Sequence, residues 1–529
     1  MDGLVDTSLC LELRDMKLKL SEIQRVYAAL KQKAQEYYQR GEFVASWLVV
    51  REAVDVIQQF SWEYCDDELE VLLEQLSKQF VSDVPMHYQG DDNRVVVVDD
   101  WCTSYVLVMQ YIDALVAAGK EILYITSKDI EASSYKNIIS IIKDYPKLIY
   151  CILPAGKQTI EKWSKGVYEK ILDFAPSKII AHIGCVSAFL PALYRMPKEL
   201  LVYRSNLDDQ VFWLGKGAID YCLEFRPFGV AVSQDRRGLK EEQQLYVPFY
   251  PIKDGNPFEG FPELPEDAVT IFSGGDFYKT LDPDYTYWNL VKQVLQDNPQ
   301  AVMLYAIKNR MGKTGEFLDA FVRDNHLEKQ FIYIGFRSDI SEVFAHADIF
   351  MGTCPVCGSL TSQLAAINHK PILQYYLPDT YDDETEQAVC YNAPGLQISF
   401  SEPKAFLAEA KRLINDVEYR KQRGEEMYAA TLKPEQFNKI FIDAITTNVA
   451  PCPRKEVNYK EVFTRWWWLE EMGFKDNLSF LYGKMKAYSL SVYSISWKFH
   501  YRRFVETKLL SWKWWKYKVM RLLGDKAKG

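Results

Sequence analysis

A short polar turn follows one of the apolar runs of this sequence and opens an expected helix. Residues 331–372 are typical of a strand, a helix, a second strand at Asp348–Met351, a turn and a further helix. The last helix begins within 358–362, whose sequence is Gly-Ser-Leu-Thr-Ser. A glycine followed by hydroxyl side chains at a helix N-terminus offers N–H and O–H donors to an anion. The turn is therefore a candidate diphosphate site, and an ordinary helix cap is the alternative interpretation.

Three side chains in the first half of the chain are candidate general bases. Asp100 follows the β-branched run Val95–Val98, and His182 follows the apolar run Ile179–Ala181. Asp209 lies in a polar loop. A general base must face the substrate from a strand end or loop, which all three positions allow. Each also has a structural interpretation, since the aspartates could order a turn and the histidine could be a core residue. The sequence does not choose among them.

The elements that must position these residues alternate between strand and helix. The range 94–250 contains β-branched and apolar runs separated by helical segments, and 268–450 repeats the pattern. The range 251–267, rich in proline, glycine and acidic residues, is expected to link them. Such alternation predicts βαβ units, so we expect an α/β protein with two Rossmann-like domains, each containing a parallel sheet. Ligands of such domains bind at the carboxyl ends of the strands.

Two flanking ranges do not follow this pattern. The range 1–85 has helical periodicity and is expected to pack or to form homo-oligomers. The range 451–529 is an aromatic, basic helical tail that contains seven of the thirteen tryptophans, Trp466–Trp468 among them. Tryptophan interleaved with lysine and arginine, as in Trp512–Leu523, suits a helix on an anionic membrane surface. The alternative is that these aromatic side chains pack on the body of the protein.

Length, charge and cysteine content restrict the class of protein. At 529 residues the chain is too long for one core. A formal net charge of -9 argues against nucleic acid as a partner. Ten scattered cysteines suggest a reducing compartment. The polar N-terminus does not look like a signal peptide, and no apolar run reaches the roughly 18 residues of a membrane span. We therefore expect a cytoplasmic protein, peripheral on the inner face of the cell membrane.

Several local strings resemble a known enzyme group. The string 272–279, Phe-Ser-Gly-Gly-Asp-Phe-Tyr-Lys, followed by Leu-Asp-Pro, is similar to the O-GlcNAc transferases and related bacterial protein glucosyltransferases. This resemblance implies that Ser273 and Gly274 line the donor site and that Lys279 touches the nucleotide diphosphate. Phe336 and Arg337 match positions that frame the nucleotide base, largely with backbone groups.

The turn at 358–361 resembles the Gly-His-Thr-Thr turn of the same group, which holds the diphosphate. Gly358 and Thr361 match that turn, whereas Ser359 stands in place of the histidine and Leu360 in place of one threonine. Leu364 stands where O-GlcNAc transferase has a ribose-binding aspartate. In the first half, 206–215 contains a Phe-Trp-Leu-Gly core similar to bacterial glycosyltransferases of surface-polysaccharide synthesis. Because Asp209 lies in this string, the resemblance makes it the first choice among the three candidate bases.

Together these resemblances imply a bacterial GT-B glycosyltransferase. Its donor is expected to be a nucleotide-sugar, with UDP favoured, and its acceptor a glycan, a lipid-linked glycan or a protein. No metal or other cofactor is expected. The sequence after Gly352 lacks the Glu-x7-Glu signature of retaining GT-B enzymes, which favours inversion. The alternatives are a non-catalytic nucleotide-binding scaffold on the same frame and, third, a sugar-nucleotide epimerase.

Overall fold

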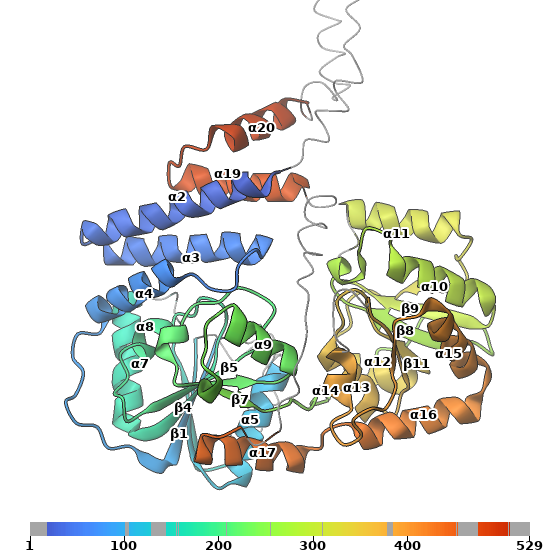
Figure 1. Cartoon of the computed structure of the whole chain (residues 1–529), viewed down its shortest axis with the longest axis horizontal. Helices are drawn as coiled ribbons and strands as arrows, with labels where there is room; N and C mark the ends of the chain where they lie inside the picture. Colours follow the sequence, from blue (N-terminus) through green and yellow to red (C-terminus); the bar gives the residue numbers. More distant parts are fainter. Residues whose placement is uncertain are drawn as a thin grey trace, which may run out of the picture. The chain divides into compact units, whose positions relative to one another are not determined.

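The computed structural model describes residues 18–100, 105–127, 144–154, 156, 158–207, 209–253, 255–308, 310, 312–377, 384–450, 452, 474–505 and 507. The chain divides into two compact units (Figure 1). The first, here called the helical unit, contains helices from both ends of the sequence. The second, the two-sheet unit, spans Ser61–Arg465 and contains every described strand.

The first sheet of the two-sheet unit is entirely parallel, with strand order β3-β2-β1-β4-β5-β6-β7. Its central run Val95–Val98 has no exposed surface, as expected for a strand covered on both faces. The strands are β1 (Asp91–Asp99), β2 (Glu121–Thr126), β3 (Leu148–Ile152), β4 (Pro176–His182), β5 (Leu201–Ser205), β6 (Tyr221–Glu224) and β7 (Gln244–Tyr246). The accompanying helices are α5 (Tyr105–Ala117), α7 (Ile160–Phe174), α8 (Leu190–Leu193) and α9 (Pro227–Asp235), with short 3-10 turns η2 (Lys216–Ala218) and η3 (Glu241–Gln243).

The second sheet is also parallel, with strand order β10-β9-β8-β11-β12-β13. Its strands are β8 (Val269–Gly274), β9 (Ala301–Ala306), β10 (Phe331–Tyr333), β11 (Ile349–Met351), β12 (Ile372–Tyr375) and β13 (Ser399–Phe400). Around it lie η4 (Phe277–Thr280), α10 (Thr286–Asp297), α11 (Gly312–Asp324), α12 (Ile340–His346), α13 (Ser359–Ile367), α14 (Glu384–Val389), α15 (Pro403–Asn415) and α16 (Val417–Ala430). Two parallel sheets with flanking helices confirm the predicted α/β class.

After the second sheet, the chain returns to the first. Helix α17 (Pro434–Thr447) packs against α5, where the ring of Tyr111 lies 5.8 Å from that of Phe437 and 5.0 Å from that of Phe441. The hydroxyl of Tyr203 on β5 donates to the carbonyl of Ile445. Although α17 falls within the range 268–450, its apolar face therefore belongs to the core of the first sheet.

The helices expected in 1–85 divide between the two units. Helix α4 (Asp67–Phe80) belongs to the two-sheet unit, where the carboxylate of Glu70 accepts from the N–H of Gly215 at 2.7 Å and from the hydroxyl of Tyr194. Earlier helices α2 (Leu20–Gln39) and α3 (Phe43–Phe60) belong to the helical unit.

The helical unit joins α2 and α3 to two C-terminal helices, α19 (Phe474–Ala487) and α20 (Tyr493–Phe504). Lys498 forms an ion pair with the buried carboxylate of Glu22 at 2.6 Å, and Gln59 bonds to Asn477 at 3.1 Å. The predicted aromatic stretches Trp466–Trp468 and Trp512–Leu523 lie outside the described residues. Among the helices that are described, none has the length and apolar content needed to cross a membrane.

Candidate functional site

The candidate donor residues lie at the carboxyl edge of the second sheet. Strand β8 ends at Gly274, and the following turn η4 carries the half-buried Lys279. The N–H of Val356, in the loop after β11, donates to the carbonyl of Lys279 at 3.3 Å. This bond fastens the lysine loop to the loop that leads into α13, so the structure brings Lys279 and the 358–361 turn to one edge.

Two glycines shape the path of the lysine loop. A side chain at Gly274 would place its Cβ only 2.3 Å from the carbonyl oxygen of Ala306 on β9, so the close approach of the two strand ends requires glycine. Gly275 has a φ of +135°, and its missing Cβ would lie 4.0 Å from Cδ of Lys279. The aliphatic stem of the lysine thus runs beside a backbone without a side chain, which leaves space at the edge.

The turn at the start of α13 uses part of its hydroxyl capacity internally. Thr361 Oγ1 donates to the carbonyl of Gly358 at 2.6 Å, and Ser362 Oγ donates to the same oxygen at 3.1 Å. Ser359 is buried, and Leu360 packs against the core of the first sheet. The groups that this helix end offers to an anion are therefore mainly its first-turn N–H groups, which lack acceptors within the helix.

Ser273 and Arg337 are occupied by structural contacts. The buried hydroxyl of Ser273 hydrogen-bonds to that of Tyr287 at 2.6 Å. Arg337 grips Asp339 through Nε and Nη2, at 2.7 and 2.6 Å, and donates to the carbonyl of Gly260 at 2.6 Å. Burial alone would raise the pKa of Asp339, but the bonds from Arg337 and neighbouring N–H groups lower it below its ordinary value. Phe336, by contrast, is 69% exposed.

The predicted base His182 lies at the carboxyl edge of the first sheet, in a buried chain of polar groups. Asp99 and His182 are paired residues at the ends of β1 and β4. His182 Nδ1 lies 2.9 Å from Asp99 Oδ1, and the hydroxyl of Tyr124 donates to Asp99 Oδ2 at 2.6 Å. All three side chains are fully buried, and His182 Nε2 has no hydrogen-bond partner in the described part of the chain. Neither Asp99 nor Tyr124 is among the predicted bases. Asp99 ends β1 directly before the predicted Asp100, which was the available signal, whereas Tyr124 lies within β2 and its contact depends on the pairing of β2 with β1.

Asp100, the next predicted base, is half-buried at the same edge. Its Oδ1 accepts from the N–H of Gly184 at 2.8 Å. Burial disfavours the charged carboxylate and raises the pKa of Asp100, although bonds from Ser187 and Gly184 oppose this rise. A carboxyl with a raised pKa is a stronger base when ionised, and this one retains some exposure.

Asp209, the third candidate base, is held by a residue that the sequence analysis missed. Arg226 directs Nε to Asp209 Oδ2 at 2.5 Å and Nη2 to Oδ1 at 2.7 Å. Both side chains are buried, with 0% of Asp209 and 7% of Arg226 exposed. Arg226 Nη1 also donates to Ser359 Oγ at 3.3 Å, at the start of α13. The sequence feature that could have indicated Arg226 is its position between the end of the expected strand 221–225 and Pro227.

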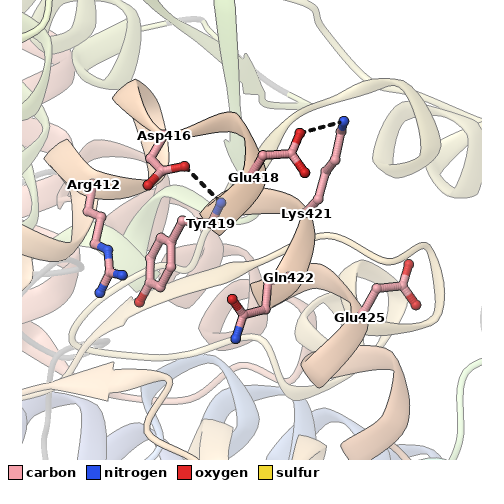
Figure 2. A pocket seen from close by; sticks show the side chains of 7 residues that line it. All are labelled: Arg412, Asp416, Glu418, Tyr419, Lys421, Gln422 and Glu425. Carbon is pink, nitrogen blue, oxygen red and sulfur yellow. Dashed lines mark hydrogen bonds and ion pairs between the residues drawn. The ribbon is translucent and has the colours of Figure 1, made fainter.

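A surface hollow elsewhere on the second sheet's domain contains none of the predicted site residues. It lies between the end of α15 and α16 and is lined by Arg412, Asp416, Glu418, Tyr419, Lys421, Gln422 and Glu425 (Figure 2). Asp416 caps α16 through the N–H of Tyr419, and Lys421 pairs with Glu418. These contacts are typical of a charged helix surface. Across the described ranges, no three His, Cys, Asp or Glu side chains are grouped so that they could hold a metal ion.

Comparison with known proteins agrees with this architecture. No protein-family model matches the sequence, and comparison with curated protein sequences yields no significant match. Among solved structures, a mutant O-GlcNAc transferase from Thermobaculum terrenum is similar, with 12% identity, a TM-score of 0.50, and coverage of 81% of this chain and 82% of the other. A glycosyltransferase from Rickettsia africae has 10% identity and a TM-score of 0.50, with 68% and 99% covered. At such low identity these likenesses establish the fold alone, and the two-sheet unit has the GT-B fold that the sequence resemblance predicts.

Proposed function

We propose that this protein is a glycosyltransferase that moves a sugar from a nucleotide-sugar, with UDP favoured, to a membrane-linked glycan or a protein. The proposal includes a metal-independent, inverting reaction. One observation carries it: within a GT-B fold, the loop of Lys279 is fastened beside the start of α13 by the bond from Val356 N–H to Lys279 O. A cationic side chain and a helix N-terminus at one sheet edge form a site suited to a diphosphate.

In this mechanism, the second sheet stabilises the leaving group. Negative charge develops on the diphosphate as the bond to the sugar breaks. The ammonium group of Lys279 and the N–H groups of the first turn of α13 come from the same sheet edge and oppose that charge. Their arrangement requires little reorganisation, because the close approach of Gly274 to Ala306 and the bond from the N–H of Gly275 to the carbonyl of Ala306 hold the lysine loop close to β9.

The first sheet supplies the base, and we favour Asp100 over the other two candidates. Asp100 is a half-buried residue and burial raises the pKa of its carboxyl, which suits a group that must take a proton from an acceptor hydroxyl. Asp209 is neutralised by Arg226. His182 is fully buried and tied to Asp99, so we assign it to the support of the edge.

The first experiment is thermal unfolding with UDP, GDP, CDP and TDP, since ligands that bind the native state raise Tm. We expect UDP to raise Tm in the wild-type protein and in Lys411→Ala, which removes an exposed lysine of α15. In Lys279→Ala the increase should be lost. If none of the four nucleotides raises Tm, the donor-binding proposal is wrong.

A nucleotide-binding scaffold is the second candidate, favoured by the replaced residues Ser359 and Leu360 and by the inward donation of Thr361 to Gly358. Incubation with UDP-glucose or UDP-N-acetylglucosamine and a membrane extract separates the candidates. UDP release that depends on the extract supports transfer. Binding of UDP without turnover supports the scaffold, and conversion of the sugar without an acceptor supports the epimerase alternative.

The helical unit supports the peripheral-membrane part of the proposal. Helix α20 exposes 81% of Tyr493, 45% of Trp497 and 47% of Phe504, at helical spacing opposite the buried Ile495. The neighbouring Arg503 is exposed, and the residues after α20 are rich in tryptophan and lysine. Aromatic residues flanked by cations suit the headgroup region of an anionic bilayer, which on a cytoplasmic protein is the inner face of the cell membrane.

Co-sedimentation tests this contact with phosphatidylcholine vesicles, with and without phosphatidylglycerol. The protein should sediment with the anionic vesicles only. The double variant Trp497→Ser/Phe504→Ser should sediment less, whereas Leu48→Ser, which removes a comparably exposed apolar residue of α3, should not differ from wild type. Equal sedimentation of the double variant and wild type would exclude α20 as the contact.

A further inference from the structure

Arg226 brings a buried positive charge from the first sheet to the start of α13. It precedes α9 at the carboxyl edge of that sheet, and its Nη1 reaches Ser359 Oγ at 3.3 Å. This proximity is supported by further contacts of α13. Gln363 Nε2 donates to the carbonyl of Phe249 at 2.6 Å, and Leu360 packs on the core of the first sheet. The first-sheet domain therefore contributes a side chain directly to the candidate donor edge.

The electrostatics of this arrangement favour an anion. A helix N-terminus carries partial positive charge, so a guanidinium beside it is unfavourable unless negative charge is also present. Asp209 supplies one such charge, through two bonds to Nε and Nη2. Those bonds occupy one side of the guanidinium and direct Nη1 toward α13. The loop of the half-buried Lys279 is bonded to the loop before α13. This edge therefore combines three sources of positive charge, namely the N-terminus of α13, Arg226 and Lys279.

We propose that Arg226 binds the diphosphate of the donor from the side of the first sheet, and that Asp209 is the residue that positions it. This inference rests on the proposed function. Arginine recognises phosphate oxygens through several N–H groups, and its orientation by a carboxylate reduces the conformational freedom lost on binding. Asp209 is then a positioning residue, in place of the general base that its sequence position suggests. Donor binding would thereby connect the two sheets through one side chain.

The experiment measures UDP affinity by isothermal titration calorimetry. Removing Arg226 alone would leave the buried carboxylate of Asp209 without its partner, so the main variant is Arg226→Gln/Asp209→Asn, which removes both charges. We expect its Kd for UDP to rise about tenfold or more, the size of a lost charge-assisted contact, with unchanged circular dichroism. The control Arg236→Gln alters an arginine at the other end of α9 and should bind UDP normally.

Asp209→Asn separates a positioning residue from a base. As a positioning residue, it should weaken UDP binding severalfold and leave the pH profile of kcat unchanged. A strong loss of kcat with unchanged UDP affinity would instead identify Asp209 as a base and overturn this assignment. If the double variant fails to fold, Arg226→Lys tests the proposal instead. A lysine keeps the positive charge but cannot form two bonds to Asp209 while also reaching Ser359. We expect severalfold weaker UDP binding by that variant, and unchanged affinity would overturn the proposal.

Failure of this inference can be distinguished from failure of the proposed function. If wild type binds UDP and Lys279→Ala weakens binding, but the folded double variant binds like wild type, the role of Arg226 is wrong and the donor site stands. If the wild-type protein binds none of UDP, GDP, CDP and TDP, both proposals are wrong.

Discussion

The carboxyl edges of the two sheets differ in how their polar side chains are satisfied. At the first edge, Asp99, His182 and Tyr124 form a fully buried chain, and Asp209 is gripped by Arg226. At the second edge, Gly274 at the end of β8 lies close to Ala306 of β9, and the half-buried Lys279 makes no ion pair with any residue that the structure describes.

The difference indicates that most polar side chains at the first edge stabilise the fold, whereas those at the second edge are available to a ligand. Buried polar groups that satisfy one another hold their positions without a ligand, and removal of one partner leaves the other uncompensated. A cation without an internal partner contributes little to folding but remains available to an anion. We therefore expect substitutions at the first edge, apart from Asp100 and the Arg226–Asp209 pair, to lower stability, and substitutions at the second edge to lower activity.

The largest expected effect concerns Asp100, the residue of the first edge that we expect to act as the general base. Asp100→Asn should lower turnover by about 10²- to 10⁴-fold, the usual contribution of a general base. In the wild type, activity should fall as the pH decreases through the raised pKa of Asp100, because the carboxyl must be ionised to accept a proton. A pH–rate profile of kcat/KM should lose this acidic limb in the variant. An unchanged profile would exclude Asp100 as the base.

At the second edge, Lys279→Ala should lower kcat by about 10²- to 10³-fold, as for the loss of one group that stabilises developing negative charge. Its unfolding midpoint in urea should match that of wild type, because no described ion pair is broken. Steady-state kinetics and urea unfolding on the same preparation check both parts. A destabilised Lys279→Ala variant would contradict the contrast between the edges.

In contrast to Lys279→Ala, the variant Asp99→Ala should lower stability. It leaves His182 Nδ1 and the hydroxyl of Tyr124 buried without their acceptor, so the free energy of unfolding should fall by about 2–4 kcal/mol. Urea unfolding gives this value directly, and Tyr124→Phe, which removes only one of the two bonds, should lose less. Wild-type stability in Asp99→Ala would show that the buried chain does not hold this edge together.

The smallest expected effect concerns Asp113, which lies in the C-terminal half of α5, away from the carboxyl edge. Burial raises the pKa of Asp113 to about 6. The folded state therefore binds a proton more tightly than the unfolded state, and stability from this group is lost as the pH rises toward 6. Asp113→Asn should raise the free energy of unfolding by less than about 1 kcal/mol at pH 8, after screening by solvent, and not at pH 4. Thermal unfolding at the two pH values measures it, and activity should not change.

Much of the architecture could be predicted from the local pattern of the sequence. The β-branched run Val95–Val98 and the alternation of strands and helices predicted two parallel sheets, because the periods of buried residues are properties of each segment alone. The same reasoning placed Lys279 and the 358–361 turn after strands of one sheet, and hence at one edge. Those positions depend only on where each strand ends.

Tertiary structure decided which side chains meet. Asp99 and His182 become partners because β4 lies beside β1, and Asp209 meets Arg226 because two loops of the first sheet converge. The return of α17 to the first sheet and the joining of α2 and α3 with α19 and α20 are contacts between distant segments. Periodicity specifies the faces that an element buries, but the partner of each face is chosen by the packing of the whole chain. The sequence by itself thus determined the two sheets and their edges, and the fold determined which polar groups on those edges are held and which are left for a ligand.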